Sequence, residues 1–149
     1  MSCEGCECSS DCGGKERRAV LRSLATGREF DLTQFAPLVC YLAGKMAGVW
    51  RFNEAGFTKG AATLRNHGVT VVSPFEVDIE NGYLVEGAGG DLVQGTNFDY
   101  EAVLADDFKV VEHVDFVTLL PGWQTSPGAN REVQHAASVG VPTYEMLWI

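Results

Sequence analysis

Short apolar runs alternate along most of the chain with stretches of helical periodicity. Four runs have the length and composition of buried strands, at residues 37–43, 69–74, 115–120 and 141–147. Between them, apolar residues recur at spacings of three and four in residues 53–67, 100–114 and 126–139. Alternating strands and helices predict an α/β fold with right-handed crossovers. We expect a Rossmann- or flavodoxin-like parallel sheet of about five strands with helices on both faces.

Two segments depart from this alternation. Residues 1–35 contain few apolar positions and form an N-terminal extension, in which Thr26 and Gly27 indicate a turn. We expect the extension to add a short helix or hairpin to the edge of a domain that spans residues 36–149. Residues 78–99 are Gly-rich and are predicted to be irregular. A connection of this length is typical of a lid or a binding loop.

Composition narrows the class of protein. The chain has 149 residues, of which 46% are hydrophobic and 21% charged, as expected for one compact domain. It contains neither an apolar run long enough to cross a membrane nor a signal peptide at its start, so we expect a cytoplasmic protein. The formal net charge of −9 argues against a nucleic-acid duplex as partner. A small anion remains compatible, because a helix N-terminus can bind one.

Residues 119–132 carry the first candidate for chemistry. They are predicted to form a strand end, a loop and the first turns of a helix, with Ser126 as the N-cap. One face of that helix then carries Ala129, Glu132, Ala136 and Val139. A carboxylate on an apolar face is costly unless it is paired or functional. Glu132 is therefore either a catalytic or binding residue or a structural partner of Arg131 or His135.

A second acid shows the same anomaly. In residues 100–114, Asp107 falls between Val103 and Val110 on the apolar face of a predicted helix. Desolvation there should raise the pKa of Asp107, which suits a proton donor. The alternative is that each acid caps a loop or anchors a backbone amide. Both carboxyls lie on adjacent helices near strand ends, where α/β sheets bind ligands, so we favour an acid and nucleophile pair.

The cysteines are concentrated at the N-terminus. Four of the five follow the pattern C-x2-C-x-C-x3-C, at Cys3, Cys6, Cys8 and Cys12. This spacing is compatible with zinc or another soft metal, but it lacks the distant second ligand pair of ordinary zinc folds. A flexible tail and redox chemistry are the alternatives. Cys40 lies in an apolar run and is expected to be a small core residue.

The order of several motifs resembles a known family. These motifs are YLAGKMAG at 41–48 with Asn53 downstream, a strand ending in Pro74, Asp107 eight residues before Asp115, and LLPGW-x-x-S-x-G-A-x-x-E at 119–132. Together they resemble the nucleoside 2-deoxyribosyltransferase superfamily over about residues 37–146. The resemblance is greatest to a small, largely uncharacterised branch common in phages and bacteria. Deoxynucleoside 5′-monophosphate N-glycosidases belong to the same superfamily.

The resemblance implies roles in catalysis. Glu132 matches the nucleophile that attacks the anomeric carbon, and Asp107 matches the acid that protonates or hydrogen-bonds the departing base. Tyr41 matches a tyrosine near the sugar and the nucleophile. A carboxylate can capture an oxocarbenium-like sugar while a neutral acid releases the base. The expected function is cleavage or transfer of the N-glycosidic bond of 2′-deoxynucleosides or their 5′-monophosphates, with no cofactor required.

The resemblance also implies a substrate-binding set. Gly44 and Met46 match the loop on the nucleobase side, and Ser126 matches the phosphate-binding serine of the monophosphate glycosidases. The set is completed by residues from the same motifs, namely Asn53, Trp123 and Gly128. Trp123 is expected either to stack on a base or to cover an edge of the core.

Two positions depart from the family pattern and motivate a second hypothesis. Lys45 stands where relatives usually have proline, and Gln124 stands where an acid is common. A non-catalytic nucleotide-binding or sensing module with the same pocket is therefore the alternative. A third hypothesis assigns the function to the N-terminal cysteines, in metal delivery or partner docking. Family members are typically oligomers and residues 146–149 are apolar, so we expect a homodimer or a higher homo-oligomer.

Overall fold

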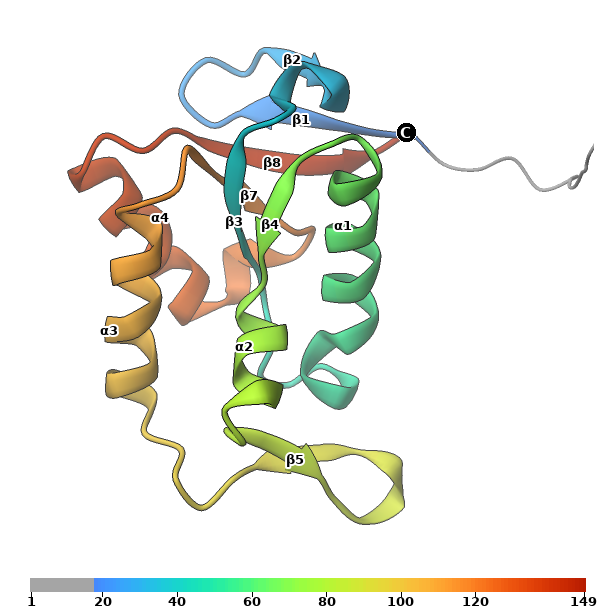
Figure 1. The fold of residues 1–149 in the computed structure, drawn as a ribbon, viewed down its shortest axis with the longest axis vertical. Coiled ribbons are helices and arrows are strands. Elements are labelled where there is room, and N and C mark those ends of the chain that lie inside the picture. The colour runs from blue at the N-terminus through green and yellow to red at the C-terminus, as the bar shows by residue number, and fades with distance from the viewer. Residues whose placement is uncertain (1–17) are drawn as a thin grey trace, which may run out of the picture.

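The computed structural model describes residues 18–149, and its centre is a six-stranded sheet (Figure 1). The strands of this sheet are β1 (Ala19–Ser23), β2 (Glu29–Asp31), β3 (Val39–Ala43), β4 (Thr70–Val72), β7 (Phe116–Leu119) and β8 (Thr143–Trp148). They lie in the order β2-β1-β8-β7-β3-β4. Neighbours from β8 to β4 are parallel, and β1 pairs antiparallel with both β8 and β2. The expected α/β class is confirmed.

The sheet differs from the expected five parallel strands because the N-terminal segment joins it. Strands β1 and β2 form a hairpin around the turn at Gly27, where φ is 75°, and β1 pairs along the whole of residues 144–148. The hairpin thereby covers an edge of β8 that would otherwise expose unpaired backbone groups. The 3-10 helix η1 (Leu32–Phe35) that follows buries Leu32 and Phe35 in the core. Residues 19–35 are thus an integral part of the sheet and its core.

The helices and remaining short elements surround the sheet. The α-helices are α1 (Glu54–Asn66), α2 (Pro74–Glu80), α3 (Tyr100–Val111) and α4 (Pro127–Ser138). The 3-10 helices beyond η1 are η2 (Trp50–Asn53), η3 (Ala88–Gly90) and η4 (Trp123–Thr125). A separate hairpin consists of β5 (Leu84–Glu86) and β6 (Leu92–Gln94). None of the helices described in residues 18–149 is long and apolar enough to cross a membrane.

The expectation of an irregular segment at residues 78–99 was wrong in part. This segment contains the end of α2, the hairpin β5–β6 and the first residues before α3. Strands of three residues carry too little alternation to be detected as a pattern. In Figure 1 the hairpin lies at the end of the molecule opposite β1 and β2.

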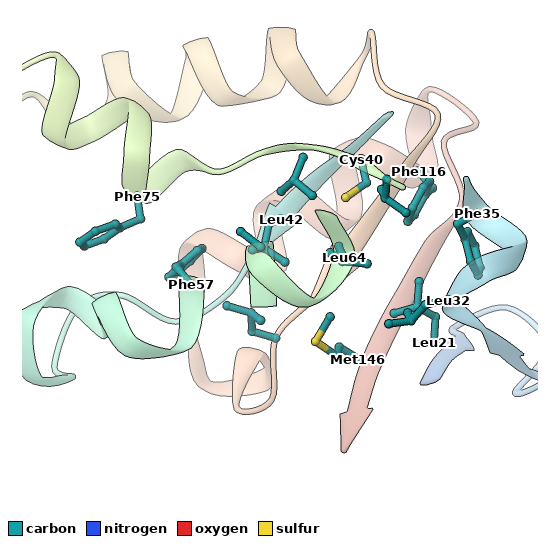
Figure 2. Close-up of a cluster of buried hydrophobic side chains, with 14 of the residues drawn as sticks. Leu21, Leu32, Phe35, Cys40, Leu42, Phe57, Leu64, Phe75, Phe116 and Met146 are labelled. Carbon is teal, nitrogen blue, oxygen red and sulfur yellow. The ribbon is translucent and has the colours of Figure 1, made fainter. Parts of the chain in front are cut away.

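Alternation along β3 divides the core between the two faces of the sheet. Cys40 and Leu42 join a cluster with residues of α1, as Figure 2 shows, whereas Tyr41 and Ala43 join a cluster with residues of α3 and α4. Helix α1 accordingly lies on one side of the strands, and α3 with α4 on the other (Figure 1). Helices on both faces are confirmed, and so is Cys40 as a core residue, because its side chain is fully buried.

The apolar C-terminus is explained within one chain. Strand β8 lies between β1 and β7, and Met146 is 1% exposed in the main core cluster. Trp148 is half-buried beneath Lys59, whose Nζ lies 4.3 Å from the ring centroid. Residues 143–148 are thus paired within the sheet and not free, whereas Ile149 is 61% exposed. The homo-oligomer itself stays a prediction.

Candidate active site

A cavity of about 420 Å³ opens where the parallel strands end. Its walls include Gly44, which follows β3, Pro74, which follows β4, and residues 126–129, which follow β7. This is the carboxyl edge of the sheet, where α/β proteins bind ligands. The volume lies within the range of small-molecule sites. The remaining lining residues are Met46, Ala47, Phe52, Asp78, Leu84, Gln94, Phe98, Tyr100, Val103, Leu104, Asp107 and Glu132.

Glu132 reaches this cavity because of where α4 begins. Ser126 is the N-cap, as predicted, and its Oγ accepts a hydrogen bond from the backbone N–H of Ala129 at 3.1 Å. This start turns Glu132 inward, where it is 6% exposed. The hydroxyl of Tyr41, on β3, donates a hydrogen bond to Glu132 Oε2 at 2.6 Å. Tyr41 thus contacts the carboxyl group, although it is not among the residues that line the cavity.

The structural alternative for Glu132 was an ion pair with a neighbour on its own helix. Arg131 instead pairs with Glu101 at 3.0 Å, and His135 pairs with Glu112 at 2.6 Å. Both of these partners lie outside the cavity lining. The ion-pair interpretation is wrong, and Glu132 is left facing the cavity with a tyrosine as its hydrogen-bond partner.

Asp107 enters the same cavity from α3. The N-cap of this helix is Asp99, whose Oδ1 accepts from the N–H of Ala102 at 3.2 Å. Burial raises the pKa of Asp107 from about 3.8 to about 6, while hydrogen bonding with Glu132 and Tyr41 opposes the rise. Across the described residues, no backbone amide donates to the Asp107 carboxyl group. The alternative of a loop cap or amide anchor is therefore not what the geometry shows.

The pKa values of Glu132, Asp107 and Tyr41 depend on one another. Burial raises the pKa of Glu132 well above its ordinary value, and the nearby Asp107 raises it further, whereas the hydrogen bond from Tyr41 lowers it. Burial and the charge of Glu132 raise the pKa of Tyr41, so its hydroxyl stays protonated. The pair of carboxyls consequently keeps a proton at pH values where exposed acids have lost theirs. One acid and one base can coexist in this cavity near neutral pH.

The structure brings part of the predicted substrate-binding set into the cavity. Gly44, Met46, Ser126 and Gly128 all line it. Asn53 does not, because its Nδ2 donates to the carbonyl of Lys45 at 2.9 Å and so ties the loop after β3 to the start of α1. Trp123 also lies outside the lining.

The indole of Trp123 contacts other parts of the protein and not the cavity. Its Nε1 donates to Glu145 Oε1 at 3.1 Å, and its ring packs against the core cluster beneath α3 and α4. Trp123 was expected either to stack on a base or to cover an edge of the core, and these contacts agree with the second alternative. A ligand in the cavity would meet the rings of Phe52, Phe98 and Tyr100 instead.

Asp78 is a site residue that sequence reasoning missed. It lies on α2, lines the cavity and is 5% exposed. Burial, and then the charge of Asp107, raise its pKa from about 3.8 to about 7. The available signal was Ser73 followed by Pro74 and Glu76, which is typical of a helix start. That signal would have put Asp78 on a helix rather than in a loop.

The metal prediction falls on residues outside the described part of the chain. Cys3, Cys6, Cys8 and Cys12 all precede residue 18. Within residues 18–149, no three His, Cys, Asp or Glu side chains are placed to hold a metal ion. Zinc at the N-terminal cysteines therefore stays a prediction.

Comparison with known proteins identifies a family and no activity. No curated protein matches the chain. A family model described as a domain of unknown function, DUF4406, matches residues 38–144. The matched span contains β3 and β7, α1 to α4 and every residue that lines the cavity. The chain therefore belongs to the DUF4406 family.

Proposed function

We propose that the protein cleaves or transfers the N-glycosidic bond of 2′-deoxynucleosides or their 5′-monophosphates. The observation that carries the proposal is the convergence of Glu132 and Asp107, from two different helices, on one cavity with Tyr41 bonded to Glu132. The order of motifs that resembles nucleoside 2-deoxyribosyltransferases supports it. We also propose that the parallel part of the sheet is Rossmann- or flavodoxin-like.

The chemistry follows from the two acids. The Glu132 carboxylate attacks the anomeric carbon, and the C–N bond breaks with its electron pair going to the base. The base takes a proton from Asp107 as it leaves. Water or a second base then attacks the sugar, gives its proton to Asp107 and displaces Glu132. Hydrolysis and transfer differ only in this last nucleophile.

The reaction requires Glu132 to be charged and Asp107 to be protonated when the substrate is bound. Burial holds a proton on the pair, and the hydrogen bond from Tyr41 to Glu132 favours the charged form of Glu132. In the unliganded site the hydrogen bond between the two carboxyls raises the pKa of Glu132 and lowers that of Asp107, so the proposed reaction requires this proton to pass to Asp107, the proposed acid, when the substrate binds. Tyr41 is therefore a positioning residue that helps to set which carboxyl attacks and which donates.

The start of α4 offers polar groups for the sugar end of the substrate. Ser126 and Gly128 line the cavity there, and the first N–H groups of a helix favour anions. Among the described residues that line the cavity, none is Lys, Arg or His. A 5′-hydroxyl or a phosphate would thus be held by the hydroxyl of Ser126 and by backbone N–H groups.

A nucleotide panel tests the proposal. The protein is incubated with 2′-deoxynucleosides and their monophosphates, with and without acceptor bases, and the products are identified by mass spectrometry. We expect a free base from at least one substrate, and its loss in Glu132→Gln. Glu112→Gln is the matched control, because Glu112 is an exposed glutamate that pairs with His135 outside the cavity.

Two results would contradict the proposal. One is the absence of base release or exchange from every substrate, and the other is release undiminished in Glu132→Gln. Substrate-dependent rises in melting temperature without any turnover would favour the non-catalytic binding module in its place.

A further inference from the structure

Burial of the Asp78 carboxyl group is energetically unfavourable, and the contacts described within residues 18–149 do not offset that cost. Its Oδ1 is inaccessible and, within the described part of the chain, has no hydrogen-bond partner. Its backbone carbonyl accepts a hydrogen bond from the N–H of Tyr83 at 2.8 Å, which leaves the carboxyl group unpaired. Buried polar groups are almost always satisfied, and an unpartnered acid calls for an explanation. Since Asp78 lines the cavity and its second carboxyl oxygen is not among the inaccessible atoms, a ligand is the partner that the cavity can supply to that oxygen.

The position of Asp78 indicates which end of a ligand it meets. Helix α2 contacts β5, and β6 contacts η2, so that Asp78, Leu84, Gln94 and Phe52 come from one connected group of elements. The proposed nucleophile and acid come from α4 and α3 instead. Asp107 nevertheless lies close enough to Asp78 to affect its pKa. A base that accepts a proton from Asp107 therefore extends toward Asp78.

We propose that Asp78 hydrogen-bonds the edge of the nucleobase, and that the preferred bases carry an exocyclic amino group at that edge. This inference rests on the proposed function for the nature of the ligand. It assigns Asp78 as the residue that distinguishes amino bases from their oxo counterparts.

The preference follows from what a carboxyl group can accept and donate. A carboxylate accepts a hydrogen bond from an amino group, and so does the C=O of the neutral acid. An exocyclic carbonyl oxygen can bond only to the O–H of the neutral acid, and it is repelled by the carboxylate. Because the pKa of Asp78 is about 7, both forms are populated near neutral pH. The amino group is thus bonded in either form and the carbonyl in only one.

Binding of matched nucleosides tests this assignment without requiring turnover. The Glu132→Gln variant, chosen so that substrate is not consumed, is titrated calorimetrically with two pairs, 2′-deoxyadenosine with 2′-deoxyinosine and 2′-deoxycytidine with 2′-deoxyuridine. We expect the amino member of at least one pair to bind about tenfold or more tightly than its oxo counterpart. Adding Asp78→Leu should bring the ratio to within about threefold, and adding Asp78→Asn should relax it, because an amide can also donate to a carbonyl.

The controls separate recognition from folding and from catalysis. Glu80→Gln, an exposed acid on the same helix, should leave the ratio unchanged. Asp78→Leu should keep the fold, since it replaces an unpartnered buried acid by an apolar side chain of similar size, and its melting curve verifies this. Equal binding of amino and oxo members, a ratio unaffected by Asp78→Leu, or no binding of any of the four would overturn the assignment. A binding preference for amino bases, together with no base release in the nucleotide panel, would contradict the proposed reaction but not the assignment of Asp78.

Discussion

Tyr41 and Glu132 are 91 positions apart in the sequence, and their hydrogen bond of 2.6 Å is the contact on which the proposed chemistry depends most closely. Because this bond lowers the pKa of Glu132, Tyr41→Phe should raise that pKa. Glu132 would then ionise at higher pH, so the ascending limb of the kcat/KM profile should move to higher pH. We also expect kcat to fall by about tenfold, the worth of one hydrogen bond to a charged group.

The measurement is base release as a function of pH for wild type and Tyr41→Phe. Tyr144→Phe is a useful comparison, since Tyr144 packs against Phe35 and Phe116 in the core, away from Glu132. An ascending limb that stays in place in Tyr41→Phe would show that Tyr41 does not tune the nucleophile.

The buried acids should also make stability depend on pH. The pKa of Asp78 is raised from about 3.8 to about 7, so the folded state binds more protons than the unfolded chain between these values. The contribution of Asp78 to stability is therefore full below about pH 4 and is lost as the pH rises through about 7. The side chain in Asp78→Asn does not ionise, so the variant does not lose this stability as the pH rises. Its melting temperature relative to wild type should increase from pH 4 to pH 8, by roughly 2 °C or more.

Scanning calorimetry of both proteins across that range tests this prediction. Glu80→Gln, at an exposed acid on α2, should follow the wild-type dependence. A melting-temperature difference that is constant with pH would mean that Asp78 is not a buried acid with a raised pKa.

Single residues of the site could be predicted where the period of their helix was clear. Glu132 and Asp107 lie on helices of 12 residues, long enough for an acid on the apolar face to stand out. Asp78 lies on a helix of 7 residues that follows a short strand, which is too short for such a pattern. The burial of Trp123 against the core depends on Glu145, a distant residue that no local pattern indicates.

At the scale of elements, the β5–β6 hairpin forms one wall of the cavity through Leu84 and Gln94. Arg51 holds it in place. Its guanidinium pairs with Glu86 at 2.8 Å and with Glu54 at 2.6 Å, and its backbone N–H donates to Asp91 Oδ1 at 3.0 Å. Arg51, with φ of 50°, begins three successive residues in the left-handed region, a conformation that needs such support.

Arg51→Ala should therefore loosen the hairpin without unfolding the domain. We expect amide exchange in residues 84–94 to rise about 3- to 10-fold, as for the loss of partly exposed ion pairs, and substrate affinity to fall. Hydrogen–deuterium exchange measured by mass spectrometry tests this prediction. Arg65→Ala, which breaks another ion pair at Glu76, should leave this segment unchanged. Unaltered exchange in Arg51→Ala would mean that the hairpin is held by its apolar contacts alone.

Element prediction succeeded where a signal was long and local. Helices α1, α3 and α4 were expected close to their observed positions. Three of the four parallel strands lie within the predicted runs, and β8 extends one residue beyond its run. Strands of three residues such as β5 and β6 were missed, because their pairing depends on each other more than on composition.

At the scale of the whole molecule, β8 joins the N-terminal hairpin to the parallel strands. Met146 is 1% exposed in this strand and Ile149 is 61% exposed just after it. Met146→Ala should lower the free energy of unfolding by about 2–5 kcal/mol, through lost apolar burial and the cavity left behind. Ile149→Ala should change it by less than about 0.5 kcal/mol.

Urea unfolding measures both values, and light scattering on the same samples gives the molecular mass. A large effect of Ile149→Ala in a dimeric protein, with little effect of Met146→Ala, would restore the C-terminus as a subunit interface. This part of the fold could not be predicted, because the pairing of β1 with β8 joins residues more than a hundred positions apart. Nothing in either segment alone specifies that partner.

The proposed function requires that Glu132 and Asp107 act together in one reaction. The most direct measurement is kcat/KM for base release from the best substrate of the panel, in wild type, Asp107→Asn, Glu132→Gln and the double variant. We predict a loss of about 10²–10⁴-fold for Asp107→Asn, a loss at least as large for Glu132→Gln, and a double variant about as slow as the slower single one. Losses that multiply in the double variant, or a single variant with wild-type activity, would contradict a shared site.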